Sequence, residues 1–232
     1  MMAAASSAPV SARRQARHVT VFLDVDGVLN SYPVPKLRSM AEGRKKLHAW
    51  HYELHYRPAV VEFFDRIVET HEVDVVWLST WSQRCKSELE PKFGLRNSFD
   101  VIEMPDETHN RFAHDPQQWW KARAMEDWLA THEHGRAIWI DDDLAWPATR
   151  EYFLENYSPN RLKLIAPDFA HGLTKAHLKE IREFAYPKAS AAKTGDSKPV
   201  ASKSGDPKTG DATTGNSATS EKKTTTDTKG TS

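Results

Sequence analysis

Short apolar runs alternate along this chain with segments in which apolar residues recur at helical spacing. The runs predict strands over residues 19–25, 73–79, 99–104, 137–141 and 161–166, and the other segments predict helices near 58–70, 83–91, 117–132, 145–156 and 173–185. Strands that alternate with helices favour an α/β fold with a parallel sheet covered on both faces. In such folds, functional groups gather at the carboxyl ends of the strands.

Residues 31–57, between the first strand and the first long helix, are too few for a large helical cap. Within them, aromatic or apolar residues alternate with polar ones at Trp50, Tyr52, Leu54 and Tyr56. This period of two predicts a strand, in a hairpin that forms a short flap over the site. His48, His51 and His55 would instead form a metal cluster if the segment were helical, but the alternating aromatic residues favour the hairpin.

The two ends of the chain differ in composition from the rest. Residues 187–232 are almost entirely Lys, Ser, Thr, Gly, Asp, Ala and Pro, with no aromatic residue and a single Val. This composition cannot bury enough apolar surface to offset the entropy of ordering, so we expect a disordered tail. Residues 1–17 are rich in Ala and Ser and are expected to form a disordered arm, which leaves residues 18–186 as one domain.

Charge and cysteine content exclude several functional classes. The formal net charge is zero, and the tail has eight Lys against five acids, an asymmetry too small for a strong nucleic-acid tether. No apolar run approaches the length of a membrane span. The single cysteine, Cys85, cannot form an intrachain disulfide and fits a reducing compartment. We therefore expect a cytoplasmic protein without membrane contact and without a stable protein partner.

The first candidate chemistry lies in residues 21–30, where Asp24 and Asp26 follow an apolar strand and precede Gly27. If the strand continues through Val25, both carboxylates point to one face, and if it breaks at Asp24 the turn re-aims Asp26. Two anions this close repel each other, and a hard cation such as Mg2+ relieves that repulsion most simply. A carboxylate and a metal define a place for phosphate. Alternatively, the two residues merely end a strand and begin a turn.

Ser79 and Thr80 stand at the end of the second apolar run, where a hydroxyl group can bind an anion or cap a helix. Lys121 and Arg123 lie in the segment 117–132, and either can supply a cation to a site. Their alternative is a solvated helix face.

The fourth apolar run leads straight into Asp141, Asp142 and Asp143. Unpaired acids at a strand end are costly unless they are solvated or neutralised, so a metal is a natural counter-charge.

Taken in this order, Asp24-Val-Asp26-Gly-Val, Ser79, Lys121 and the acids at 141–143 resemble the four motifs of the haloacid dehalogenase (HAD) superfamily. The second acid of the first motif favours its phosphatase branch. The sequences at 77–81 and 172–174, with the short flap, resemble the HAD domain of bacterial and phage RNA-repair proteins named for Swiss-army-knife assemblies. The resemblance covers about residues 19–186. It implies a Rossmannoid three-layer sandwich with a central five-stranded parallel sheet and no large cap.

The resemblance also implies a mechanism. Asp24 attacks phosphorus to form an aspartyl-phosphate, Asp26 acts as acid and base, and Ser79 and Lys121 hold phosphoryl oxygens. Mg2+ would be bound by Asp24, Asp142 and the backbone carbonyl of Asp26, with Asp141 farther from the ion or linked to it by a water. Asp143 is expected to cap a helix over 144–157.

The substrate is less constrained by the sequence. Thr80, Trp81 and Arg84 are candidate substrate contacts, since Trp81 or Trp146 can stack on a base and Arg84 can reach a phosphate. Alternatively, the two tryptophans pack beneath the flap and Arg84 lies on a helix surface. We expect a Mg2+-dependent phosphohydrolase that removes terminal phosphates from nucleotides or RNA ends. The alternatives are a small-metabolite phosphatase and a non-catalytic module that binds phosphorylated partners.

Overall fold

The computed structural model describes residues 18–105 and 112–187. By its internal contacts the chain divides into two units, Met1–Ala189 and Ser190–Ser232, and all described residues belong to the first. The predicted arm at 1–17 lies outside the described residues, as does the predicted tail except for Pro187. No helix among the described residues is long and apolar enough to span a membrane.

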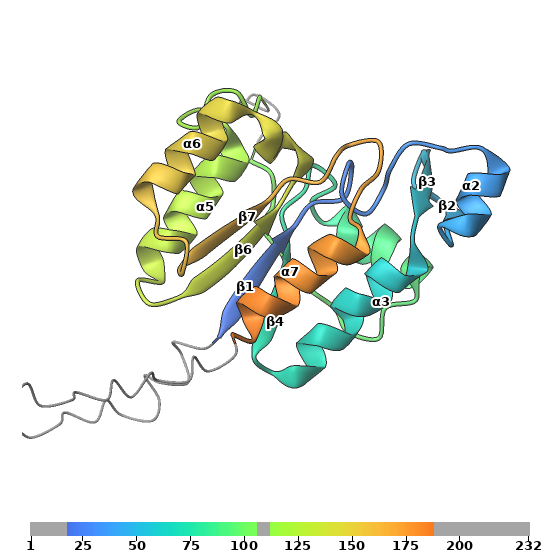
Figure 1. The fold of residues 1–232 in the computed structure, drawn as a ribbon, viewed down its shortest axis with the longest axis horizontal. Helices are drawn as coiled ribbons and strands as arrows, with labels where there is room; N and C mark the ends of the chain where they lie inside the picture. Colours follow the sequence, from blue (N-terminus) through green and yellow to red (C-terminus); the bar gives the residue numbers. More distant parts are fainter. Residues whose placement is uncertain (1–17, 106–111, 188–232) are drawn as a thin grey trace, which may run out of the picture. The chain divides into compact units, whose positions relative to one another are not determined.

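A five-stranded parallel sheet forms the centre of this unit, with strand order β5-β4-β1-β6-β7 (Figure 1). Its strands are β1 (Val19–Leu23), β4 (Val73–Trp77), β5 (Asp100–Val101), β6 (Arg136–Ile140) and β7 (Leu162–Ile165). In β1, Leu23 pairs with Trp77 of β4 and with Ile140 of β6, so the three central strands end at the same level. The predicted five-stranded parallel sheet is therefore confirmed.

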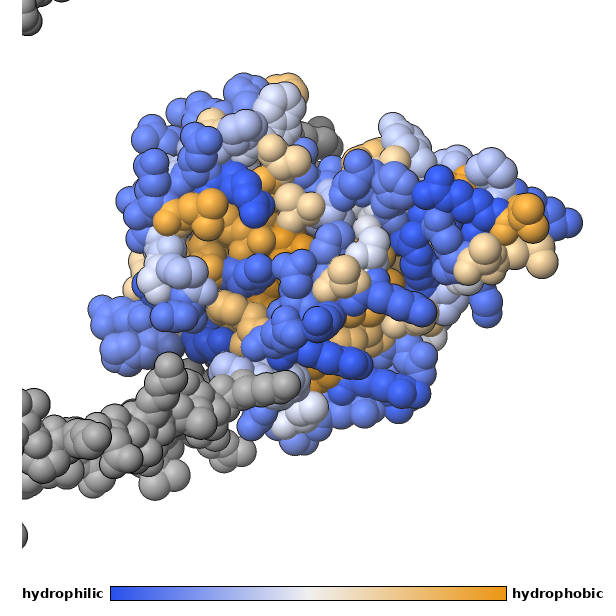
Figure 2. Space-filling view, viewed as in Figure 1, coloured by the Kyte–Doolittle hydropathy of each residue, from blue (hydrophilic) through white to orange (hydrophobic). Residues whose placement is uncertain are grey.

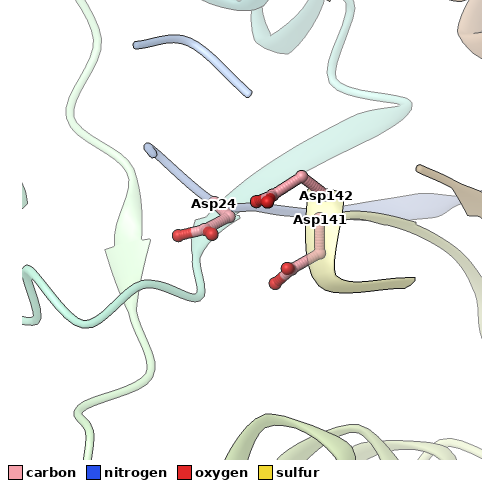
Figure 3. A group of neighbouring side chains, drawn as sticks. All are labelled: Asp24, Asp141 and Asp142. Atoms are coloured by element: carbon pink, nitrogen blue, oxygen red, sulfur yellow. The ribbon is translucent and has the colours of Figure 1, made fainter. Parts of the chain in front are cut away.

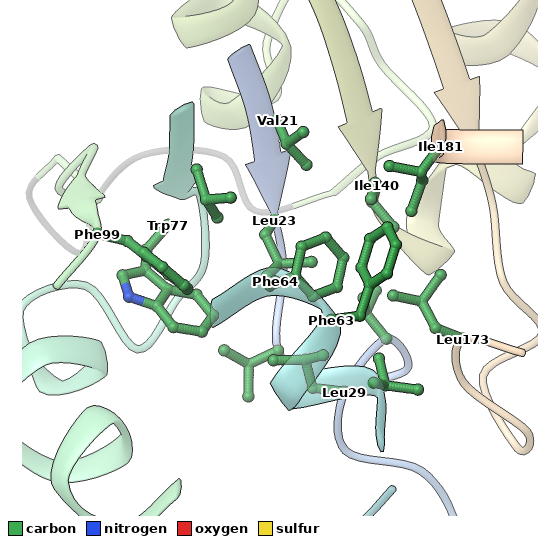
Figure 4. Close-up of a cluster of buried hydrophobic side chains, with 14 of the residues drawn as sticks. Val21, Leu23, Leu29, Phe63, Phe64, Trp77, Phe99, Ile140, Leu173 and Ile181 are labelled. Carbon is green, nitrogen blue, oxygen red and sulfur yellow. The ribbon is translucent and has the colours of Figure 1, made fainter. Parts of the chain in front are cut away.

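Helices cover both faces of the sheet (Figure 1). They are α3 (Pro58–Ile67) and α7 (Lys175–Ala185) on one face, and α5 (Trp120–Thr131) and α6 (Pro147–Asn156) on the other. Side chains alternate across β1: Val21 and Leu23 pack in one core with α3 and α7, as Figure 4 shows, and Phe22 packs in the other core with α5 and α6. This alternation follows from the two-residue period of a strand and confirms the three-layer sandwich.

The insertion between β1 and α3 contains the predicted hairpin. Strands β2 (Lys45–Ala49) and β3 (Tyr52–Tyr56) pair antiparallel as a separate two-stranded sheet. His48 and His55 therefore lie on strands and His51 in the turn, so the helical metal cluster considered as an alternative is wrong. Besides the hairpin, this insertion holds only the short helix α2 (Lys36–Ala41), so no large cap is present between β1 and α3.

The sequence analysis did not predict α2, a helix of six residues none of which is buried. Leu37 and Met40 of this helix are exposed, and Figure 2 shows an apolar spot over α2, apart from the larger apolar areas nearer the centre of the view. An exposed helix of six residues is too short to be recognised from periodicity alone.

The base of the hairpin is fixed to the loop before α7 by a charged network. Glu42 accepts hydrogen bonds from Arg44 Nε and Arg57 Nη2, both at 2.6 Å. Arg57 Nη1 in turn donates to the carbonyl oxygens of His171 and Leu173, at 2.6 and 3.2 Å. The side chain of Arg44 is almost completely buried. The hairpin is therefore held in one place at its base.

Several predicted strand boundaries were too long. The strands predicted over 19–25 and 73–79 end at Leu23 and Trp77, where the chain turns into the site. The strand predicted over 99–104 is reduced to Asp100–Val101 because it is an edge strand that pairs with only the last two residues of β4.

Helix boundaries also differ from the prediction. The helix predicted near 83–91 is present, but residues Cys85–Leu89 have π-helical geometry (η2), and the helix continues as the short α4 (Glu90–Phe93). Helix α3 ends in a 3-10 turn, η1 (Val68–Thr70). The prediction that Asp143 caps a helix over 144–157 is wrong. Residues Asp142–Ala145 form a 3-10 turn, η3, whose cap is the side chain of Asp141, and α6 begins only at Pro147.

Candidate active site

Three carboxylates meet at the carboxyl edge of the sheet. Asp24 directly follows β1, and Asp141 and Asp142 follow β6, the strand beside it. Each offers an oxygen that lies within 4.8 Å of the other two. Figure 3 shows the three side chains at the ends of their strands. The backbone ladder continues past the strand ends, since Asp24 N donates to Ile140 O at 3.1 Å. The sheet itself therefore sets the spacing of these acids.

Lys121 of α5 lies between two of these acids. Its Nζ is 2.8 Å from Asp24 Oδ2 and 2.7 Å from Asp141 Oδ2, and all three side chains are buried. Burial alone would favour the neutral amine, but the charges of Asp141 and Asp24 outweigh it and raise the pKa of Lys121. The ammonium is therefore retained. Arg123, the other candidate cation, is exposed on the same helix.

The acids outnumber this single cation, which makes the cluster suitable for a divalent metal. Burial, and after it the charges of Asp24 and Asp143, raises the pKa of Asp142 to about 7. Asp141 already uses Oδ2 for Lys121 and Oδ1 for the backbone N–H of Asp143, at 3.1 Å. Carboxylate oxygens around an excess of negative charge are the donor set that Mg2+ prefers. All three acids of the cluster, Asp24, Asp141 and Asp142, are therefore candidate ligands of a metal ion.

Gly27 brings the turn after β1 against this cluster. Its φ is +69°, a left-handed conformation that suits glycine. A Cβ atom at this position would lie 2.3 Å from Asp142 Cγ and 2.7 Å from Phe169 Cδ2. The turn therefore requires glycine both for its backbone conformation and for the close approach to Asp142.

Asp26 does not join the three carboxylates. Because β1 ends at Leu23, the turn re-aims its side chain, which is the second of the two outcomes that the sequence left open. Its Oδ1 accepts a hydrogen bond from Asn30 Nδ2 at 2.7 Å, and its Oδ2 accepts one from Trp81 Nε1 at 2.9 Å. Both oxygens of this carboxylate are thus held by neutral donors.

The loop after β4 supplies Ser79 and Trp81. Ser79 is buried, and its Oγ accepts a hydrogen bond from the backbone N–H of Trp81 at 3.4 Å. Trp81 is only 5% exposed and packs beneath the hairpin against Trp50 and Tyr52, with ring centroids 6.3 and 5.7 Å apart. This burial agrees with the alternative in which Trp81 packs beneath the flap, because no ring face is left for a base. Thr80, next to Ser79, is exposed.

Arg84 lies against the tip of the hairpin rather than on a bare helix surface. Its guanidinium is 4.1 Å from the centroid of the Trp50 ring. Trp146, the other tryptophan considered for stacking, is half exposed, and its ring centroid lies 6.1 Å from that of His114. Cys85 is fully buried, and burial raises the pKa of its thiol, which agrees with a packing role and not with a nucleophile.

Residues 20–178 match the family model described as the HAD domain in Swiss Army Knife RNA repair proteins. The chain belongs to this family. No curated protein and no solved structure matches it. Membership in the HAD family indicates a phosphohydrolase-type function, and HAD domains typically depend on Mg2+.

The structure of this HAD domain brings together Asp24, Lys121, Asp141 and Asp142, and places Asp26 and Ser79 on the adjoining loops. Sequence reasoning missed Asn30, whose contact with Asp26 depends on the turn between them. The packing of Trp81 against Trp50 and Tyr52 agrees with the alternative in which this tryptophan lies beneath the flap. Sequence reasoning missed the further contact of its indole N–H with Asp26.

Proposed function

We propose that this HAD domain is a Mg2+-dependent phosphohydrolase that acts through an aspartyl-phosphate on Asp24. The observation that carries the proposal is the buried Asp24 carboxylate, fixed 2.8 Å from the Lys121 ammonium within a cluster of acids suited to a hard cation. The neighbouring Asp26 supplies the second carboxyl group that a two-step hydrolysis needs. When bound by Asp24 and Asp142, Mg2+ would neutralise phosphate charge and orient the phosphoryl group.

In the first step an oxygen of Asp24 attacks phosphorus, and the bond from phosphorus to the leaving oxygen breaks. Asp26 gives its proton to that leaving oxygen. In the second step Asp26 takes a proton from water, whose oxygen attacks the phosphoryl group, so that phosphate leaves and the Asp24 carboxylate is restored. Lys121 and the Ser79 hydroxyl hold the non-bridging oxygens throughout.

We propose nucleotides or RNA ends as the substrates. The support is the tip of the hairpin, where Trp50 and Tyr52 are about half exposed and the Arg84 guanidinium lies over Trp50. These rings rest on Trp81, whose indole reaches Asp26, so they lie beside the site and not across the molecule from it. Stacking of a base on an aromatic side chain contributes about 1–3 kcal/mol.

The first experiment measures phosphate release by the purified protein with Mg2+ from an aryl phosphate, a panel of nucleotides, and RNA phosphorylated at its 3′ or 5′ end. We expect release by the wild type and none by Asp24→Asn. Asp100→Asn is the matched control, because Asp100 is an exposed acid on the edge strand β5. This variant should keep full activity. A folded wild-type protein that binds these ligands without releasing phosphate would refute the enzyme and favour a binding module.

A second comparison separates nucleotides from small metabolites. Trp50→Gly removes the exposed ring and retains a turn whose φ is +51°. If bases stack on Trp50, this variant should raise KM for nucleotides about tenfold and leave KM for glycerol phosphate unchanged. If the wild type and Trp50→Gly have equal KM values on every substrate, the result favours the small-metabolite phosphatase.

A further inference from the structure

Both oxygens of the Asp26 carboxylate are fixed by side chains from different parts of the chain. Asn30 Nδ2 donates to Oδ1 at 2.7 Å, and Trp81 Nε1 donates to Oδ2 at 2.9 Å. An aspartate on a turn otherwise rotates about its side-chain bonds at little cost. Two donors on opposite oxygens therefore select one orientation of this carboxylate.

The first donor, Asn30, is itself fixed by the hairpin. Its Oδ1 accepts a hydrogen bond from the backbone N–H of His55 in β3 at 2.9 Å. The next residue repeats the link, because the Ser31 backbone N–H donates to His55 O at 3.0 Å. With its oxygen used by β3, the Asn30 amide can only present its NH2 group to Asp26.

The second donor, Trp81, is fixed by the other end of the hairpin. The rings of Trp50 and Tyr52 pack against it, and Trp50 is held in turn by Arg84 over its ring and by Glu88, which accepts from its backbone N–H at 3.3 Å. Trp81 is 5% exposed, so its indole has little room to rotate while the hairpin is in place. Both donors to Asp26 therefore depend on the same hairpin.

We propose that the β2–β3 hairpin orients the Asp26 carboxyl group through Asn30 and Trp81, which are positioning residues for proton transfer to the leaving group. This role rests on the proposed phosphohydrolase function, in which Asp26 is the acid and base. Displacement of the hairpin would release both oxygens of Asp26 together, so that proton transfer is efficient only when the hairpin lies over the site.

The decisive variant is Trp81→Phe, which keeps an aromatic ring beneath the hairpin and removes the N–H. General acid catalysis contributes about 10²–10⁴-fold, and it matters most when the leaving group is poor. We therefore measure kcat and KM for phenyl phosphate and for 2,4-dinitrophenyl phosphate, whose leaving group needs no proton. Trp81→Phe should lower kcat on phenyl phosphate about tenfold more than on the dinitrophenyl ester, with KM nearly unchanged.

Trp77→Phe is the matched control. Trp77 is also buried, and its Nε1 also donates to a carboxylate at 2.9 Å, but that carboxylate is Glu90, outside the acid cluster. It should show no dependence on the leaving group. If Trp81→Phe does not fold, Asn30→Leu removes the other donor and should give the same dependence. Equal losses on both esters, or the same result for Trp77→Phe, would overturn the positioning role.

A readout without turnover keeps this role distinguishable from the proposed function. The indole N–H resonance of Trp81 in the ¹H–¹⁵N NMR spectrum should move in Asp26→Asn and also in Tyr52→Ala, which loosens the hairpin. If the wild type releases no phosphate from either ester but this resonance moves in both variants, the phosphohydrolase proposal fails while the link from hairpin to Asp26 stands. A resonance that Tyr52→Ala leaves unmoved would refute the link itself.

Discussion

Replacing Lys121 by Met tests whether the buried charge cluster is held together as the structure indicates. Lys121, Asp24 and Asp141 have side chains that are 4%, 7% and 0% exposed, and the two ion pairs are 2.8 and 2.7 Å long. Met nearly matches the length of the Lys side chain and removes its charge together with its N–H donors. The variant would leave two buried carboxylates side by side without this cation.

The expected loss of stability is large. Removal of one partner from a buried ion pair destabilises a protein by about 3–5 kcal/mol, because the remaining charge is neither solvated nor paired. In a domain of this size each kcal/mol lowers Tm by about 2–4 °C, so Tm should fall by about 10 °C. Mg2+ should restore part of the loss, since a divalent cation can neutralise the same carboxylates.

The assay is thermal and urea unfolding, both followed by circular dichroism, first in a chelator and then in Mg2+. Lys163→Met is the control, because Lys163 pairs with Glu180 at 3.1 Å on the surface, where both side chains are more than a third exposed. Such a pair contributes about 0–1 kcal/mol. If Lys121→Met loses no more stability than Lys163→Met, the cluster does not depend on the Lys121 charge and the reasoning is wrong.

Three other predictions follow from the site and its surroundings. Gly27→Ala should lower Tm, measured by thermal unfolding, much more than Gly94→Ala does. Both glycines have a φ near +70°, but of the two only Gly27 would bring a Cβ within 3 Å of neighbouring side chains. In metal-free protein the raised pKa of Asp142, about 7 against 3.8, means that the folded state holds a proton that the unfolded state has lost. Stability should therefore fall as the pH rises from about 4 to about 7, and urea unfolding at pH 5 and pH 8 should show a smaller fall in Asp142→Asn. Asp65→Ala should lower the free energy of unfolding in urea by about 1–3 kcal/mol. The reason is that this buried side chain accepts hydrogen bonds from backbone and side-chain N–H groups of the loop after α4. A loss below about 0.5 kcal/mol would contradict that role.

Local pattern in the sequence determined the order of strands and helices and the hairpin. Each apolar run is long enough for one buried strand, and alternation at Tyr52, Leu54 and Tyr56 has the period of a strand whichever partner it meets. Because parallel strands place their carboxyl ends at one edge, the sequence also indicated that Asp24, Ser79 and Asp142 share that edge.

The tertiary structure alone decided how the charged groups pair. Lys121 and Arg123 are two positions apart on one helix and point in different directions, so only one can be buried, and packing of α5 on the sheet decides for Lys121. Asp26 and its partners are likewise beyond local pattern. Its direction depends on β1 ending at Leu23, and its donors come from a turn and from a loop 55 residues away. A side-chain hydrogen bond of this kind requires a donor–acceptor distance correct to within a few tenths of an ångström. The periodicity of the sequence does not encode such distances, and only the packing of the folded chain fixes them.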